Sequence, residues 1–213
     1  MDDWGLYPLF LKLQGKRCLV IGGGGVAYRK ILDLLDCGAV VTMVAEKPIQ
    51  ECYDIAQRGE IKLLSRSFRQ EDIKGMFLIF AATDDGEVNA EIAILARREG
   101  ILVNAVDDPA KCDFLSGSVV TRGPLRIAIS TSGYSPLIAH KIRCELEGRY
   151  DETYGDFIHA VGEMRKEILA SGCMDEKKTL SLNWLAREYA FTLFKTSGKE
   201  MVWEEVKKIL YSL

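Results

Sequence analysis

The 213-residue sequence contains little histidine and no closely spaced cysteine pair. His140 and His159 are its only histidines, which argues against a multi-histidine metal site within one chain. The six cysteines are scattered without a C-x-x-C pair, which disfavours both a zinc site and a disulfide framework. We therefore expect no metal held by the chain, and we expect reduced, mostly buried thiols of a reducing compartment.

Long apolar runs and a strong excess of one charge are also missing. No run approaches the ~20 apolar residues that cross a bilayer, and the acidic start Met1-Asp2-Asp3 lacks the basic region of a signal peptide. The formal net charge is only -3, which disfavours duplex nucleic acid as the main partner. These absences predict a cytoplasmic protein with neither a membrane nor a nucleic-acid partner.

The first half of the sequence alternates short apolar, β-rich runs with helical patterns, which is typical of βαβ units around a parallel sheet. The runs are apolar throughout rather than alternating, as expected when helices cover both faces of the sheet. We therefore predict a Rossmann-like, doubly wound α/β fold. The predicted strands span residues 17–21, 40–45, 61–64, 77–82 and 101–106.

The pattern changes after residue 113. Two short strands are predicted at 118–120 and 125–130, and a helix begins at Ser135-Pro136, with Ser as N-cap and Pro in the first turn. The last third predicts only helices, at 154–169, 178–194 and 200–210. The expected organisation is a Rossmann-like domain (1–113), a small α+β segment (114–150) and a helical C-terminal domain (151–213).

A glycine-rich turn follows the first strand and fits G-x-G-x-x-A at Gly22, Gly24 and Ala27. Gly22 permits a tight turn, Gly24 lets a pyrophosphate approach the backbone, and Ala27 allows close packing of helix on strand. A glycine match alone is weak, but the strand, the helix and the βαβ context are all present. The turn therefore predicts dinucleotide binding rather than a merely structural turn.

Three other strand ends carry candidate polar groups. Glu46 follows the second strand and suits the ribose hydroxyls of NAD, although Lys47 beside it weakens this choice over NADP, and a solvated charge pair is the alternative. After the fourth strand, Thr83 is a candidate cofactor contact, whereas Asp84 and Asp85 suit a turn and helix cap. After the fifth strand, Asp107 is the candidate acid/base, because apolar neighbours can desolvate its carboxylate. Its neighbour Asp108 suits an Asp-Pro turn.

The segment 129–136, Ile-Ser-Thr-Ser-Gly-Tyr-Ser-Pro, places hydroxyls and free N–H groups ahead of a helix. Such a segment suits carboxylates; ordinary helix capping is the alternative, and both roles can hold together. Residues 111–149 hold six basic and three acidic side chains in an otherwise acidic chain. This excess favours a small anionic ligand over nucleic acid, and scattered surface charge is the alternative.

Taken together, these motifs resemble the precorrin-2 dehydrogenase family, the dehydrogenase module of siroheme synthase. The resemblance covers roughly the first 150 residues and runs through Tyr-Pro-Leu-Phe at 7–10, GGGGVAYRK at 22–30, AATDDGEVN at 81–89, NAVDDP at 104–109 and ISTSGYSP at 129–136. It implies NAD-dependent oxidation of precorrin-2 to sirohydrochlorin by a homodimer. Residues 1–113 would then form the NAD-binding domain, and residues 114–150 the dimerisation and substrate-binding segment. Some members of the family also insert iron to give siroheme. The helical C-terminal third matches by pattern only, and we expect no methyltransferase domain.

The resemblance also implies roles for individual residues. Gly25 and Val26 match the family's cofactor-contacting turn, and Glu46 and Lys47 match its second cofactor contact. Asp107 matches the aspartate implicated in dehydrogenation and, in bifunctional members, in chelation. The cofactor-binding candidates are Gly22, Gly24, Gly25, Val26, Glu46, Lys47 and Thr83. The substrate-binding candidates are Asn104, Ser130, Thr131, Ser132, Gly133, Ser135 and Arg143, with Thr131 standing where some members have serine.

Two other functions remain open from the sequence. The nucleotide-binding regulatory domains of potassium transporters share a glycine turn and a Thr-Asp-Asp stretch, and a domain of this kind would explain residues 17–106. It would leave the loop at 129–136 without a role. A dehydrogenase acting on another anionic substrate is the second alternative.

Overall fold

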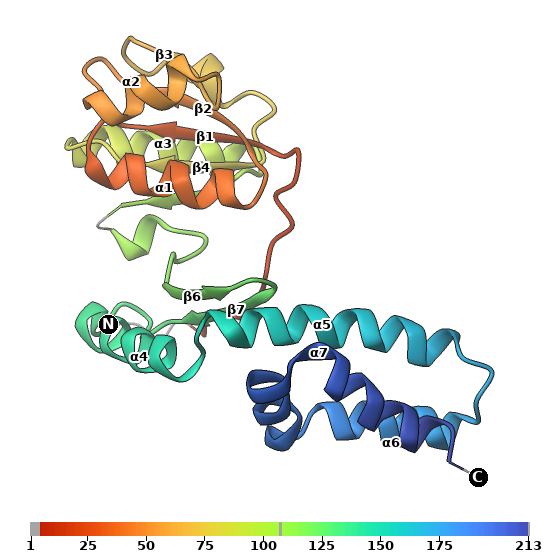
Figure 1. Cartoon of the computed structure of the whole chain (residues 1–213). Helices are drawn as coiled ribbons and strands as arrows, with labels where there is room; N and C mark the ends of the chain where they lie inside the picture. Colours follow the sequence, from red (N-terminus) through yellow and green to blue (C-terminus); the bar gives the residue numbers. More distant parts are fainter. Residues whose placement is uncertain (1–4, 107, 213) are drawn as a thin grey trace. The chain divides into compact units, whose positions relative to one another are not determined.

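The computed structural model describes residues 5–106 and 108–212. The chain divides into two compact units, residues 1–116 and 117–213, which are described separately below (Figure 1). The three-part division expected from the sequence stays a prediction.

The first unit contains a five-stranded parallel sheet with the order β3-β2-β1-β4-β5. Its strands are β1 (Arg17–Ile21), β2 (Val40–Val44), β3 (Lys62–Leu64), β4 (Leu78–Ala81) and β5 (Leu102–Ala105). Its helices are α1 (Gly25–Asp36), α2 (Gln50–Gln57) and α3 (Gly86–Arg98), with short 3-10 turns η1 (Gln70–Ile73) and η2 (Pro109–Lys111). The chain therefore winds from the central β1 in both directions, as predicted for a doubly wound fold.

Both faces of this sheet are buried, which explains why its strands are apolar throughout. On one face, Val20 and Phe80 pack in a cluster with Ile31 of α1. On the other, Leu19 and Ile92 belong to a second cluster. Helices α1 and α3 lie on opposite faces of the sheet (Figure 1). The first predicted strand agrees with β1 in both bounds, and the other four extend one residue too far at one or both ends. Their apolar runs continue past the hydrogen-bonded ladder, because burial does not stop where strand pairing stops.

The second unit begins with an antiparallel hairpin and continues as helices. Strands β6 (Ser118–Arg122) and β7 (Leu125–Ile129) turn at Gly123, whose φ is 51°. The helices are α4 (Pro136–Arg149), α5 (Glu152–Ala170), α6 (Asp175–Leu185) and α7 (Glu188–Leu210). Met164, Leu185 and Val206 lie in the core that α5, α6 and α7 share. A parallel α/β unit followed by a small antiparallel sheet and helices confirms the predicted fold class.

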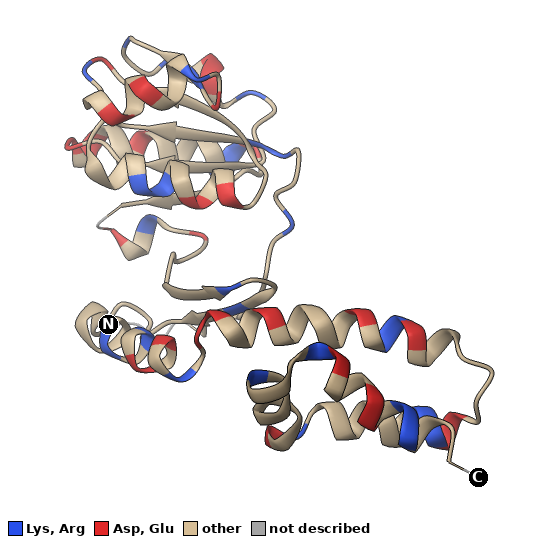
Figure 2. Cartoon of the chain, in the orientation of Figure 1, with Lys and Arg blue, Asp and Glu red and all other residues tan. Residues whose placement is uncertain are grey.

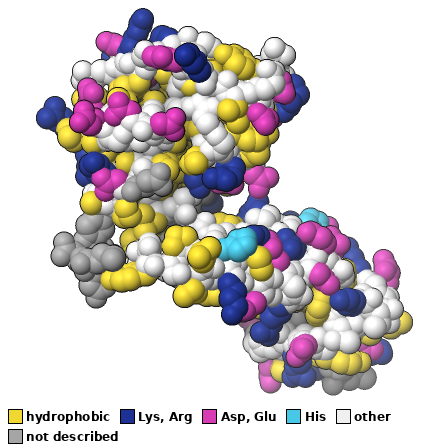
Figure 3. Space-filling model, turned by 90° about the vertical axis from the view of Figure 1, so that its left-hand side faces the viewer, with side chains coloured by type: hydrophobic (Ala, Val, Ile, Leu, Met, Phe, Trp, Pro, Cys, Tyr) yellow, Lys and Arg dark blue, Asp and Glu magenta, His cyan; other side chains and the backbone are white. Residues whose placement is uncertain are grey.

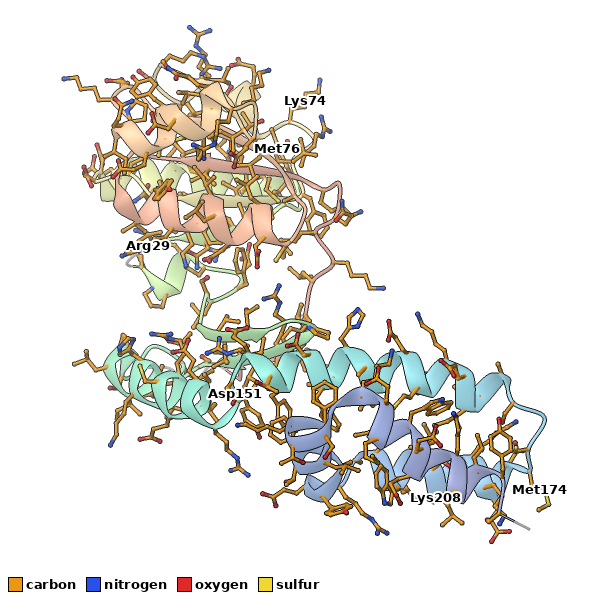
Figure 4. The ribbon with its side chains drawn as sticks, in the orientation of Figure 1. Arg29, Lys74, Met76, Asp151, Met174 and Lys208 are labelled. Atoms are coloured by element: carbon orange, nitrogen blue, oxygen red, sulfur yellow. The ribbon has the colours of Figure 1, made fainter. Side chains whose placement is uncertain are left out.

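Charged side chains fix the start of α5. Figure 4 labels Asp151 at this point of the chain. Its carboxylate accepts a hydrogen bond from the Tyr154 N–H at 3.1 Å, and it pairs with Lys195 of α7 at 3.0 Å. The pKa of Asp151 is lowered, mainly by the hydrogen bond from Lys195. Figure 2 shows Lys and Arg interspersed with Asp and Glu along the helices of this unit. Such mixed charge is typical of solvated helix faces.

One helix prediction was wrong. The sequence predicts a single helix at 178–194, but α6 ends at Leu185 and α7 begins at Glu188. The chain breaks at Arg187, whose φ of -80° and ψ of 148° are extended, so that α6 and α7 can pack against one another. The break predicted between 194 and 200 corresponds to a kink inside α7 at Gly198, where φ is 81°.

The prediction of mostly buried thiols was also wrong, although all six cysteines are free. Cys18 and Cys52 are buried, Cys112 and Cys173 are half-buried, and Cys37 and Cys144 are exposed. Within residues 5–106 and 108–212, no helix is both long and apolar enough to cross a membrane. In the same ranges, no group of three or more His, Cys, Asp or Glu side chains is arranged to hold a metal ion.

Candidate active site

The glycine turn lies at the carboxyl edge of the sheet, between the central strands. Gly22 has a φ of 124°, and a Cβ there would lie 2.0 Å from the backbone oxygen of Ala82 at the end of β4. Its N–H donates to the Val44 carbonyl oxygen of β2 at 3.0 Å. Gly22 therefore packs β1 against both neighbouring strands at the point where the winding of the sheet reverses. This reversal point is where ligands bind in open α/β sheets.

The next part of the turn is open rather than packed. A Cβ on Gly24 or Gly25 would meet no atom within 4 Å, although Gly24 is the N-cap of α1. No side chain caps α1, and its first turn contains no acidic residue. Its first N–H groups have no partner within the helix, while Ala27, which is fully buried, holds the helix close to the sheet. The space and the free donors fit the pyrophosphate of a dinucleotide.

The loop after β2 is held against the glycine turn. The Gly23 carbonyl oxygen accepts from the Ile49 N–H at 2.9 Å, and a Cβ on Gly23 would lie 2.9 Å from the Lys47 carbonyl oxygen. Glu46 and Lys47 are exposed at this edge, and the Glu46 carboxylate accepts a hydrogen bond from the Ser67 hydroxyl. The fold thus brings both predicted cofactor contacts beside the glycine turn, as a ribose-binding role requires.

Thr83 follows β4 at the same edge, but its hydroxyl is already engaged. It donates to the Asn89 side-chain oxygen at 2.7 Å and accepts from the Asp85 N–H at 3.2 Å. Asn89 is buried and returns a hydrogen bond to the Thr83 carbonyl oxygen at 3.0 Å. Sequence reasoning missed this role of Asn89, although the motif at 81–89 ends on it. Asp85 caps α3 by accepting from the Glu87 N–H at 2.8 Å, as predicted, and Asp84 is exposed.

The candidate acid/base Asp107 lies outside the described residues. On one side of it, the Val106 N–H donates to the Ala81 carbonyl oxygen at 2.9 Å, so the chain leaves β5 at the carboxyl edge of the sheet. On the other side, Asp108 accepts from the Ala110 N–H at 3.2 Å, and its carboxylate lies 2.7 Å from the Lys111 ammonium. That lysine holds the pKa of Asp108 below its usual value. Asp108 therefore has the turn role predicted for it.

Asn104 is buried in β5, where its amide holds a neighbouring segment of chain. It donates to the Phe114 carbonyl oxygen at 2.9 Å and to the Cys112 sulfur at 3.4 Å. Burial raises the pKa of the Cys112 thiol, which donates to the Ala105 carbonyl oxygen at 3.1 Å. The Phe114 ring meets the Phe80 ring edge-on. The amide of Asn104 thus ties residues 112–114 to the sheet, and a role in substrate binding stays a prediction.

The loop 130–135 closes on itself before α4. Thr131 Oγ1 donates to the Ser135 carbonyl oxygen at 3.0 Å and accepts from the Ser135 N–H at 3.2 Å. The Ser130 hydroxyl accepts from the Ser132 N–H at 3.1 Å. Ser132 and Gly133 have left-handed φ values of 51° and 83°. The loop is therefore a tight turn stabilised by its own hydroxyls.

The capping prediction for α4 is confirmed. Ser135 is its N-cap, and the Ser135 hydroxyl accepts from the Ile138 N–H at 3.3 Å. Arg143 lies further along the helix, where it pairs with Glu147 and approaches His140 Nδ1 at 3.3 Å. The fold therefore gathers the predicted loop residues at the start of α4, while Arg143 already has a carboxylate partner.

Comparison with known proteins matches both units. A family of NAD(P)-binding proteins matches residues 9–118, and the central part of sirohaem biosynthesis proteins matches residues 122–149. The chain therefore belongs to the family of NAD(P)-binding proteins, and its residues 122–149 are in addition similar to sirohaem biosynthesis proteins. This membership confirms the resemblance seen in the sequence and the expectation of a nicotinamide dinucleotide cofactor.

Individual relatives agree with this family. The siroheme synthases of Methylococcus capsulatus and Chromobacterium violaceum are each 42% identical to the chain, over 161 and 164 residues. These alignments cover 76% and 77% of this chain but 34% and 35% of the relatives, so the chain spans about a third of their length. The solved structure of SirC, a precorrin-2 dehydrogenase, is 27% identical with a TM-score of 0.81, covering 95% of this chain and 100% of SirC.

Proposed function

We propose that this chain oxidises precorrin-2 to sirohydrochlorin, with NAD as the electron acceptor. The observation that carries the proposal is the similarity to SirC, which extends over the whole of that dehydrogenase and therefore includes the unit beyond the nucleotide fold. A non-catalytic nucleotide sensor would account for the first unit only. The siroheme synthase relatives align with most of this chain as part of longer chains, which agrees with a dehydrogenase module.

The first unit would hold the cofactor. The free N–H groups at the start of α1, around Gly24, Gly25 and Val26, would bind the pyrophosphate, and Glu46 would accept hydrogen bonds from a ribose. Gly22 would shape the turn that presents these groups. When bound, NAD supplies a site that accepts a hydride from the substrate. The protein's own contribution is to orient the reactants and to exclude water.

The second group of candidates would bind the carboxylates of the tetrapyrrole. The tight loop around Thr131 and Ser132 presents hydroxyl groups ahead of α4, and such groups suit carboxylates. Removal of a hydride and a proton extends the conjugation of the macrocycle, and Asp107 is our proposed acceptor of that proton. Asn104 and Arg143 stay candidates for substrate binding. Asn104 is already bonded to the Phe114 carbonyl oxygen and Arg143 to Glu147, so each would add the substrate to this contact or exchange the contact for it.

The test is to mix the protein with precorrin-2 and NAD and follow the absorbance of NADH and of sirohydrochlorin. We expect one NADH for each sirohydrochlorin. The Asp107→Asn variant should lower kcat at least ~100-fold while leaving the Kd of NAD unchanged, because general acid-base catalysis contributes factors of this order. A protein that binds NAD but makes neither product would support the sensor. Turnover of a different anionic compound, and not of precorrin-2, would support the other dehydrogenase.

We also propose that the chain forms a homodimer in the cytoplasm. Several large apolar side chains are exposed on the second unit, including Val119, Tyr134, Leu137 and Ile138. Figure 3 shows apolar side chains gathered on the side of this unit that faces the viewer. Leu137 is the most open of them, at 82% exposed. Exposed apolar groups of this kind favour a protein interface. Leu137→Glu should convert a dimer to a monomer in sedimentation, whereas Lys141→Glu, which alters an exposed charge on α4, should not.

A further inference from the structure

The edge that carries Glu46 also contains two contacts that the sequence motifs leave unexplained. The first joins Ser67 to Glu46, where the Ser67 hydroxyl donates to Oε1 of the carboxylate. The two residues lie 21 positions apart in the chain and come together because β2 and β3 are paired, with the Ala45 N–H donating to the Leu64 carbonyl oxygen at 3.2 Å. The direction of the Glu46 carboxylate therefore depends on a side chain from the loop after β3.

The second contact holds the guanidinium of Arg66, which is adjacent to Ser67. Its Nη1 and Nη2 donate to the two carboxylate oxygens of Asp72 at 2.8 and 2.6 Å, and Nη1 also donates to the Ser67 carbonyl oxygen at 2.9 Å. The Asp72 side chain is only 8% exposed and accepts a further bond from the Arg69 N–H at 2.9 Å. Arg66 holds the pKa of Asp72 below its usual value. The pair is thus a bidentate clamp on a buried carboxylate.

We infer that Ser67 and Asp72 are positioning residues that make this edge select NAD over NADP. Ser67 keeps the Glu46 carboxylate aimed for a ribose 2′-hydroxyl, and Asp72 keeps the Arg66 guanidinium away from the place where a 2′-phosphate would lie. The inference deepens the proposed function and rests on the cofactor site assigned there.

The two cofactors differ by one phosphate, and each contact acts on that difference. A carboxylate accepts hydrogen bonds from ribose hydroxyls but repels a phosphate, whereas a free guanidinium binds phosphate through two parallel hydrogen bonds. Arg66 can offer such a pair only by leaving Asp72, which would strand a mostly buried carboxylate without its cation. Lys47 is exposed beside Glu46, but its ammonium is a point charge without the planar fork of arginine.

The experiment measures the Kd of NAD and of NADP by calorimetry, without precorrin-2, for the full chain and its variants. We expect the wild type to bind NAD at least ~10-fold more tightly than NADP, a factor typical of one charged contact. Asp72→Asn should release Arg66 and reduce this ratio about tenfold, mainly by strengthening NADP binding. Adding Arg66→Gln should restore the wild-type ratio. Ser67→Ala should reduce the ratio by weakening NAD, and Ser67→Thr should restore it.

The matched control is Glu71→Gln, which removes one negative charge from the exposed neighbour of Asp72 and leaves the clamp intact. Its ratio should equal that of the wild type. If Ser67→Ala and Asp72→Asn change the two dissociation constants by the same factor, the residues are merely structural and the inference is wrong. It is also wrong if the wild type shows no preference for NAD. Should Asp72→Asn fail to fold, the Ser67 variants decide, because they alter only an exposed hydroxyl. A protein that prefers NAD but does not oxidise precorrin-2 would overturn the proposed function alone.

Discussion

Two of the loops that lead into helices differ in how the first N–H groups of the helix are satisfied. The glycine turn enters α1 without a capping side chain and with empty space around Gly24. The loop 130–135 enters α4 with the Ser135 hydroxyl already bonded to the Ile138 N–H. Both sequences suggested an anion site. The structure leaves donors free for a ligand at α1, whereas at α4 the loop itself uses part of the donor set.

The comparison teaches that hydroxyl-rich and glycine-rich loops suit different ligands. A glycine cap cannot satisfy an N–H group through a side chain, so an anion can bind there without displacing any protein group. A serine cap stabilises its helix in the absence of ligand. We therefore assign the pyrophosphate to the start of α1. We expect the loop before α4 to bind the substrate through the hydrogen-bonding capacity that its hydroxyls have left.

The largest effect is expected when a methyl group is added at Gly22. Gly22→Ala would place Cβ 2.0 Å from the Ala82 carbonyl oxygen at a φ of 124°. Backbone strain and this clash should destabilise the first unit by about 3 kcal/mol or more and abolish NAD binding. Denaturant unfolding would measure the stability, and calorimetry would measure the binding of NAD. A variant that unfolds like the wild type would show that the turn is not packed as described.

The matched change at Gly24 separates ligand binding from packing. A Cβ at position 24 would meet no atom within 4 Å, and the φ of -89° there suits any residue, so Gly24→Val can be accommodated. We expect the stability to fall by no more than about 1 kcal/mol, because the only loss is at an N-cap. NAD binding should nevertheless weaken at least ~100-fold, since the side chain fills the space that the pyrophosphate needs. Normal NAD affinity in this variant would contradict the assignment of the pyrophosphate to α1.

A smaller effect is expected at the other loop. Ser135→Ala removes the cap of α4 and should lower the stability of the second unit by about 1 kcal/mol. The Kd of NAD should not change, because that cap does not belong to the cofactor site. Ser135→Thr keeps the capping oxygen and serves as the control in thermal unfolding. A large loss of NAD affinity in Ser135→Ala would remove the contrast between the two loops.

The effect that is smallest at neutral pH concerns the strand that leads into the glycine turn. Burial raises the pKa of Cys18 in β1 to about 11, so this thiol stays protonated in the folded state while the unfolded chain loses its proton near pH 9. The folded state then binds more protons, and stability should fall as the pH rises from 9 to about 11. Cys18→Ala should flatten this part of the stability curve. An unchanged curve would show that Cys18 does not titrate as expected.

The sequence predicts much of the first unit because local and global signals agree there. The glycine turn, the buried strands and the Asp85 cap each follow from spacing and residue type. The contacts that hold Glu46 and Thr83 could not be predicted in the same way. Ser67 meets Glu46 only through strand pairing, and Asn89 meets Thr83 through the first turn of a helix. Such partners depend on tertiary geometry that periodicity does not encode.

The boundaries of the C-terminal helices could not be predicted from local signals in the sequence. The break between α6 and α7 contains neither glycine nor proline, and its position is set by packing in the shared core. Gly198 does mark a change of direction, but the chain continues as helix on both sides of it. The family match ends at residue 149, so the helices beyond it are shared with SirC at the level of structure.

The central claim is that the first-turn N–H groups of α1 hold the dinucleotide. Amide hydrogen exchange in the presence and absence of saturating NAD tests it most directly. We predict that NAD slows exchange in the segment 22–28 and leaves the segment 130–138 unchanged. Protection confined to 130–138, or no protection of 22–28 at saturation, would contradict the account.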